Sequence, residues 1–172
     1  MMLRLVKAFW DIALWKRSPA HLPASLFLLA VVAAAAALLE VLGALLPPVS
    51  TDGMSVRILL SVALPLGFTW AVLLVTRRRH RFLQTGIALL GVEVLVELIL
   101  DPLGSLLHVV GSERIVSVPI EVIMLVGLIW YMLACANIWR VALDSGLAIG
   151  IAISVGYFLL SLALEQRLLP DA

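Results

Sequence analysis

Residues 91–102, GVEVLVELILDP, decide how the chain folds. They consist mainly of Val, Leu and Ile, as in the middle of a membrane-spanning helix, yet Glu93, Glu97 and Asp101 recur every four residues. Each helical residue turns the chain by about 100°, so the three carboxyl groups fall within roughly 80° of one helix face. Ionisable groups inside a membrane are costly and usually functional, and the stripe is therefore a candidate site.

The composition of the whole chain also indicates a membrane environment. Of its 172 residues, 63% are hydrophobic and 13% are charged, and the mean hydropathy is +1.16. Ordinary soluble domains contain about 45–50% apolar and about 25% charged residues. The sequence therefore predicts an integral membrane protein. Its single cysteine, Cys135, excludes a disulfide within the chain and a cysteine-based metal site.

Five stretches reach the length of roughly 20 apolar residues that a membrane-spanning helix requires. The predicted fold class is an all-α integral membrane protein, a five-transmembrane-helix bundle that leaves little chain for a soluble domain. Residues 102–112 are apolar but too short to span, so we expect an outer, re-entrant or interfacial loop there. A bare Arg140 is the expected break between the last two spans. The bundle occupies residues 24–165, with spans at 24–46, 58–76, 82–100, 115–139 and 141–165.

Residues 1–17 differ from the spans in their pattern. Charged and apolar side chains separate onto different sides of a helical wheel, which is typical of an amphipathic helix lying in the membrane interface. Docking on a partner protein is the alternative interpretation. The polar side carries Arg4, Lys7 and Asp11, and the apolar side carries Leu3, Val6, Trp10, Ala13 and Leu14.

The basic residues predict the orientation of the chain. With the N-terminus inside, nine of the twelve Lys and Arg residues lie on the inner side, which is the bias of cytoplasmic loops. We therefore expect the N-terminus inside and the C-terminus outside. The inner basic cluster is interpreted as a topology signal, with docking of anionic lipid or of a partner as the alternative. It consists of Arg77, Arg78, Arg79 and Arg81.

Two more carboxyl groups join the acidic stripe when depth in the membrane is compared. A rise of about 1.5 Å per residue places Glu40 of the first span and Glu121 of the fourth roughly 7 Å outward of the midplane, close to the level of Glu97. An acidic residue at a helix centre opposes insertion by about 2.5–3.5 kcal/mol, so these groups should face the bundle interior, a water-filled cavity or another protein. The predicted intramembrane acidic cluster comprises Glu40, Glu93, Glu97, Asp101 and Glu121.

The cluster allows four interpretations. In the first, the carboxyl groups clamp helices together through hydrogen bonds to the backbone or to Ser117, Asn137 or Thr69. In the second, they receive a basic residue of a partner subunit. The third is a cation or proton pathway that opens outward, with His108 and Asp101 at its mouth and a metal ion as an open alternative. Catalysis is the fourth, but no nucleophile or metal-protease motif accompanies the acids, so we expect no catalytic residue, no enzyme and no cofactor.

Small residues recur at four-residue steps in the last span. Such a ridge lets another helix approach closely, either within the bundle or between protomers. Arg140 and Asp144, also four residues apart, are expected to pair at the inner end of the helix. The helix-packing ridge consists of Ala142, Gly146, Gly150 and Ser154.

The architecture also resembles that of a known family. Five spans, short loops and the tight junction ANIWRVALDSGLAIG at 136–150 are similar to the Yip1-type membrane proteins, including their small bacterial members. The stretch RRHRFLQTGIALLGVE at 78–93 resembles the start of the third span in small proteobacterial membrane proteins. The chain does not have the long soluble N-terminal region of the eukaryotic members, so their association with small GTPases and vesicle traffic is not carried over.

The resemblance favours a non-enzymatic scaffold or accessory protein that acts through other membrane proteins in a bacterial cytoplasmic (inner) membrane. The expected partners are the lipid bilayer and other membrane proteins or a second copy of the chain, with no nucleic acid. The alternative function is a small cation or proton transporter that uses the intramembrane carboxylate cluster. No internal repeat is visible and five spans do not divide into equal inverted halves, which counts against transport.

Overall fold

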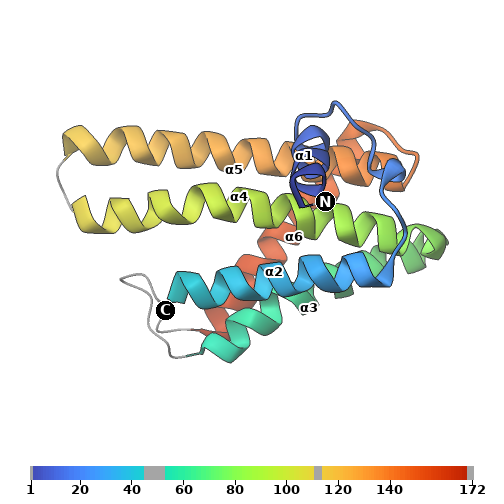
Figure 1. Cartoon of the computed structure of the whole chain (residues 1–172), viewed down its shortest axis with the longest axis horizontal. Helices are drawn as coiled ribbons and strands as arrows, with labels where there is room; N and C mark the ends of the chain where they lie inside the picture. Colours follow the sequence, from blue (N-terminus) through green and yellow to red (C-terminus); the bar gives the residue numbers. More distant parts are fainter. Residues whose placement is uncertain (1, 45–52, 111–113, 170–172) are drawn as a thin grey trace.

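The computed structural model describes residues 2–44, 53–110 and 114–169, which form helices joined by short loops (Figure 1). Five of these helices are long and apolar enough to cross a membrane, as the sequence predicts. The helices are α1 (Met2–Ala13), α2 (Leu26–Ala44), α3 (Met54–Val75), α4 (Phe82–Val110), α5 (Arg114–Ala142) and α6 (Leu147–Leu168), with short 3-10 turns at Pro19–His21 and Arg79–Arg81.

Helix α4 is the centre of the bundle. It packs against α2, α3 and α5, while α6 lies against α5 and also reaches α3. Figure 1 shows α4 running beside α5, with α2 along its other side and α1 crossing both α4 and α5. More than half of the α4 span is buried, whereas less than a quarter of every other span is. The acidic stripe therefore lies on the helix that has the most protein around it.

The two ends of the bundle differ in their chemistry. At the basic end, the loop after α3, which carries the inner basic cluster, lies beside the loop after α5, which carries Asp144. At the open end lie the last turn of α2, the first turn of α3 and the last turn of α6. We call the half next to the basic end the closed half, residues 2–36, 66–96 and 131–154. The open half comprises residues 37–44, 54–65, 97–110, 114–130 and 155–168.

The closed half contains the hydrophobic core. The side chains of Ile12, Ile87 and Trp139 come from α1, α4 and α5, and each exposes 2% or less of its surface. In the part of the open half that the structure describes, Pro65 and Ile120 are the only buried apolar residues. Burial of large side chains is the main stabilising term in folding, so the closed half holds the bundle together.

Helix α1 docks across α4 and α5 in the closed half. The ring of Phe9 lies directly over Gly91 of α4, where a Cβ atom would overlap the ring. The indole Nε1 of Trp130 donates a hydrogen bond to the backbone oxygen of Ala13 at 3.2 Å. The docked face consists of Ala8, Phe9, Ile12 and Ala13, of which only Ala13 belongs to the apolar side that the sequence pattern singled out.

Three of the remaining predicted apolar residues of α1 form a second, exposed face, while the side chain of Leu3 lies outside the described residues. Val6, Trp10 and Leu14 each expose more than a third of their surface, although Trp10 packs edge-on against Trp130 with ring centroids 5.6 Å apart. The prediction of a single apolar side was therefore incomplete. Apolar residues cover so much of this helix that one part contacts the bundle and the other does not.

The segment after Asp101 is helical, and the predicted loop at 102–112 is wrong as far as Val110. Helix α4 continues through Pro102 to Val110, and residues 111–113 lie outside the described residues. Proline removes one backbone hydrogen bond, but the apolar run that follows stays favourable as helix in a membrane, where every backbone group must find a partner within the helix.

The junction between α5 and α6 also differs from its prediction. Helix α5 runs past Arg140 to Ala142, and Asp144 takes a left-handed conformation with φ 43°. Because the helix has ended, Arg140 and Asp144 are not paired; the Arg140 guanidinium lies over the ring of Trp15, 5.9 Å from its centroid. The predicted ion pair was therefore wrong, for a reason of backbone geometry.

Asp144 instead joins the two loops of the basic end. Arg81 donates from Nη1 to Oδ1 and approaches Oδ2 with Nη2, at 3.0 Å each, and Arg78 also contacts Oδ2. Arg81 Nη1 further donates to the backbone oxygen of Val141 at 2.7 Å, near the end of α5. The hydrogen bonds from Arg81 and Arg78 lower the pKa of Asp144 below its ordinary value. Two members of the inner basic cluster thus hold the fold together, while Arg77 and Arg79 are exposed.

Candidate functional site

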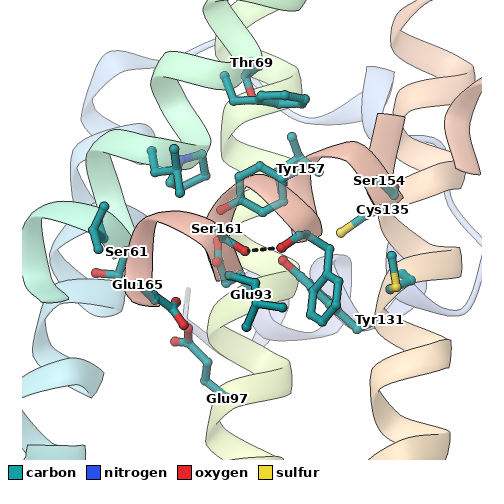
Figure 2. Close-up of a pocket in the computed structure, with 18 of the residues that line it drawn as sticks. Ser61, Thr69, Glu93, Glu97, Tyr131, Cys135, Ser154, Tyr157, Ser161 and Glu165 are labelled. Carbon is teal, nitrogen blue, oxygen red and sulfur yellow. Dashed lines mark hydrogen bonds between the residues drawn. The ribbon is translucent and has the colours of Figure 1, made fainter. Parts of the chain in front are cut away.

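A cavity of about 450 Å³ lies between the spans and is lined by residues of all five of them (Figure 2). Its walls are mixed, with apolar, aromatic, hydroxyl and charged side chains. Four carboxyl groups and one guanidinium group reach it: Glu40 of α2, Arg57 of α3, Glu93 and Glu97 of α4, and Glu165 of α6. We refer to it as the acidic cavity.

The floor of the acidic cavity is formed by hydroxyl groups in the closed half. Thr69 lies about 9 Å along α3 from the basic end, and Ser154 lies about 10 Å along α6, at 1.5 Å per residue. Both residues are buried, exposing 0% and 4% of their surface, and both line the cavity. Figure 2 shows Thr69 at one extreme of the cavity and Glu97 with Glu165 at the other.

The middle level combines one carboxyl group with aromatic rings. Glu93, Tyr131 and Tyr157 all lie roughly 15–17 Å from the basic end, on α4, α5 and α6 respectively. Phe68 extends the aromatic wall, with its centroid 5.3 Å from that of Tyr157 and 6.0 Å from that of Trp139. A positive charge at this level would meet a carboxyl group, and it would be attracted to the face of a neighbouring ring.

The mouth of the acidic cavity is the most charged level. Glu40 and Glu97 lie roughly 21–23 Å from the basic end, and Arg57 and Glu165 lie roughly 27 Å from it. A second cavity, of about 350 Å³, shares Glu40, Arg57 and Glu97 with the first and adds Asp101. The two cavities therefore meet at three charged residues from three helices.

Several polar atoms around the acidic cavity are buried without a hydrogen-bond partner. In the described part of the chain these include Thr69 Oγ1, Ser154 Oγ, Glu97 Oε2 and Arg57 Nε. Unpaired buried polar groups are uncommon and each calls for an explanation. Asn137 Oδ1 also has no partner, so neither Asn137 Oδ1 nor Thr69 Oγ1 takes part in the carboxyl clamp that the first interpretation requires.

The structure separates the predicted acidic cluster into three groups. Glu40, Glu93 and Glu97 line the acidic cavity, and Asp101 lines the second cavity. Glu121 lies on an exposed part of α5 and lines neither of them. For His108 the side chain lies outside the described residues.

Four further site residues were not singled out from the sequence. Arg57 and Glu165 fall at the ends of predicted spans, where charged residues ordinarily reach water, and their depth was the available signal. Tyr131 and Tyr157 are single polar rings inside apolar runs, and the sequence offers no pattern that distinguishes them from core residues.

The carboxyl groups are too far apart to form a conventional metal site. No group of three or more His, Cys, Asp or Glu side chains in the described ranges is close enough to hold one metal ion. Divalent hard cations are bound by several oxygen ligands at once. In the described residues, no three carboxyl groups of this cavity therefore surround a single point.

The predicted helix-packing ridge is divided by the end of α5. Ala142 belongs to α5 and Gly146 precedes α6, so only Gly150 and Ser154 lie on one helix. Gly150 is buried against α5, and a Cβ atom there would overlap the backbone oxygen of Ala136. This contact lies within the bundle, and it positions Ser154 at the cavity floor.

Comparison of the chain with family models, with curated proteins and with solved structures gives no match.

Proposed function

We propose that the protein is a non-enzymatic integral membrane protein that acts through other membrane proteins, as a scaffold or accessory component. The observation that carries this proposal is the position of Glu121. It lies on an exposed part of α5, among apolar residues that expose half or more of their surface, such as Val118, Val122 and Leu125.

The surroundings of Glu121 favour a protein partner over lipid. Its place four residues into the span of α5 corresponds to a depth of about 6 Å. A carboxyl group that faced lipid there would be unfavourable, whereas a helix carrying a basic or hydrogen-bonding residue would pair with it. The Yip1-type resemblance also supports a bundle without enzymatic activity. The partner helix could belong to another protein or to a second copy of this chain.

The proposal includes a bacterial cytoplasmic membrane and an orientation. The basic end faces the cytoplasm, the N-terminus is inside and the C-terminus is outside, in agreement with the positive-inside rule. In this orientation α1 lies on the inner side of the bundle, with Phe9 against Gly91 roughly 14 Å along α4 from its basic end. Its docked face contacts the bundle, the exposed apolar face with Trp10 and Leu14 contacts lipid, and Arg4, Lys7 and Asp11 reach toward water.

Site-specific crosslinking tests the partner. A photo-crosslinking residue replaces Val122 beside Glu121, and a control replaces Leu159, which is equally exposed but lies on α6. We expect Val122 to give a discrete membrane-protein adduct in native membranes that is weakened by Glu121→Leu. An equal adduct from Leu159, or none from Val122, would contradict the proposal.

A second candidate function, transport of a small cation or proton, is favoured by the acidic cavity. Carboxyl groups at successive depths are the arrangement found along ion and proton pathways in membranes. A liposome flux assay tests it with the wild-type protein and with Glu97→Gln, and Glu121→Gln serves as the control outside the cavity. Transport predicts a flux that is lost in Glu97→Gln alone, and the absence of flux in the wild type would rule it out.

A further inference from the structure

We propose that the acidic cavity binds a linear aliphatic diamine or polyamine, with one ammonium group beside Glu93 and the next about one helical turn farther out, beside Glu97. The inference uses the cavity of the second candidate function, but it requires binding only and holds whether or not the ligand is transported.

The spacing of the carboxyl groups points to two positive charges on one ligand. Glu93 and Glu97 are four residues apart on α4, which separates them by about 6 Å along the helix axis. A chain of four methylene groups holds two nitrogen atoms roughly 6 Å apart when its torsions are staggered. No three ligating side chains of the described residues meet around one point, so the cavity does not offer the several oxygen ligands that a divalent cation prefers.

The walls of the cavity suit an aliphatic chain. Leu64 and Leu89 contribute apolar surface, and the rings of Phe68, Tyr131 and Tyr157 stand at or near the level of Glu93. Methylene groups would pack on this surface, and the ammonium group would gain from the neighbouring rings. A volume of about 450 Å³ lies within the range of small-molecule sites, which is about 300–1,000 Å³.

The unpaired hydroxyl groups at the floor are an independent indication of a ligand. Thr69 Oγ1 and Ser154 Oγ are buried, line the cavity and have no partner within the described residues. Hydroxyl oxygens accept hydrogen bonds from an ammonium group, which has up to three N–H donors to satisfy. These hydroxyl groups lie roughly 6–7 Å deeper than Glu93, so a further ammonium group of a polyamine, about one helical turn deeper than the one beside Glu93, would find them as acceptors.

Arg57 makes the distribution of charge along the cavity uneven. It lies at the mouth, roughly 10 Å nearer the open end than Glu93 along its own helix. Its positive charge compensates part of the acidic charge of Glu40 and Glu165 there. The carboxyl group least compensated by Arg57 therefore lies deeper, at Glu93, which favours entry of one ammonium group past the mouth.

The test is a titration of the purified full-length protein in detergent at neutral pH, followed by calorimetry and by thermal unfolding. The probes are 1,4-diaminobutane and spermidine, with n-butylamine and Mg²⁺ as comparators. We expect saturable binding of the diamine and a raised unfolding temperature. Glu93→Gln and Glu97→Gln should each weaken binding by about tenfold or more, because a charge-assisted hydrogen bond is lost.

Matched variants distinguish binding at the acidic cavity from a general effect of the charge of the protein. Glu121→Gln removes a carboxyl group outside the cavity and should bind the diamine like the wild type. Should Glu93→Gln fail to fold, Glu97→Gln still tests the outer carboxyl level with the diamine, and Ser154→Ala tests the floor with spermidine; both variants should weaken binding. The proposal is overturned by no saturable binding to the wild type, by equal binding of butylamine or Mg²⁺, or by unchanged affinity in the folded cavity variants. The Val122 crosslink reports on the partner separately, so either proposal can fail alone.

Discussion

In the closed half, Ile12, Ile87 and Trp139 are almost completely buried, whereas in the open half Leu98, Leu125 and Val126 expose more than half of their surface. Some of these residues lie on the same helices, since α4 and α5 run through both halves. Composition does not explain the contrast, because both halves are apolar. Helix α1, the short loops of the basic end and the close α5–α6 contact exist only in the closed half.

This difference in packing indicates which half of the bundle can change its conformation more easily. Regions with few buried apolar contacts open at lower free energy than the packed core of the same protein. The mouth of the acidic cavity, with Glu40, Glu97, Arg57 and Glu165, belongs to the open half, while its floor rests on the closed half. We therefore expect a ligand to enter through the loosely packed open half and to bind against the tightly packed closed half.

A pair of substitutions on α4 tests the contrast with the largest expected effect. Ile87→Ala removes a fully buried side chain in the closed half and should lower the free energy of unfolding by about 2–5 kcal/mol. Leu98→Ala removes an exposed side chain of the open half and should cost less than about 1 kcal/mol. Unfolding in detergent by denaturant measures both. Equal losses would mean that the halves are equally packed.

A pair of glycines on α6 gives the next largest effect. Gly150→Ala places a methyl group against the backbone oxygen of Ala136 and should destabilise the protein by about 1–3 kcal/mol, because backbone cannot move aside cheaply. Gly156→Ala meets nothing within 4 Å and should be neutral or slightly stabilising, as alanine is the better helix former. Thermal unfolding of the two variants compares them directly. A stable Gly150→Ala protein would show that α6 does not pack closely on α5.

The sequence predicted the positions of the helices better than it predicted which face of a helix packs against the bundle. Five helices long and apolar enough to span a membrane follow from apolar length alone, and the described residues contain five such helices. The loop predicted after Asp101 was wrong because residues 102–112 were treated as a separate segment too short to span, although α4 continues to Val110. The docked face of α1 could not be read from its pattern, because apolar residues cover two sides of that helix and only packing distinguishes them.

Prediction of the candidate site from the sequence is limited in the same way. Depth along a span follows from counting residues, and Glu40, Glu93 and Glu97 do line one cavity. The rotation of a helix about its axis decides which way a side chain points, and this rotation does not follow from counting residues. The outer half of α5 is apolar on every side, so nothing in its sequence distinguished the exposed position of Glu121 from an inward one. The partners of Asp144 were hidden for a related reason, since they come from a loop more than sixty residues earlier.

A smaller effect is expected at the basic end and depends on pH. Asp144 has a lowered pKa, so its ion pairs with Arg81 and Arg78 stabilise the fold above the ordinary carboxyl pKa and are lost as the pH falls through the lowered value. Asp144→Asn should therefore lower the unfolding temperature at pH 7, and the gap to the wild type should close in acid. A gap that is the same at pH 7 and at pH 3 would show that the carboxylate charge does not join these loops.

The smallest effect on stability, and one of opposite sign, is expected at the cavity floor. Thr69→Val keeps the shape of the side chain but removes a buried hydroxyl without a partner, so the ligand-free protein should gain up to about 1 kcal/mol. Thr76→Val is the control on the same helix, because its hydroxyl donates to the backbone oxygen of Val72 at 2.7 Å and its loss should cost about 0.5–1.5 kcal/mol. Unfolding of both variants without ligand measures the two signs. If Thr69→Val is destabilised as much as Thr76→Val, the hydroxyl is satisfied within the fold and the floor belongs to the packed core. If it is stabilised yet binds spermidine less tightly, the hydroxyl is retained at a cost to the closed half, and the ligand is the reason.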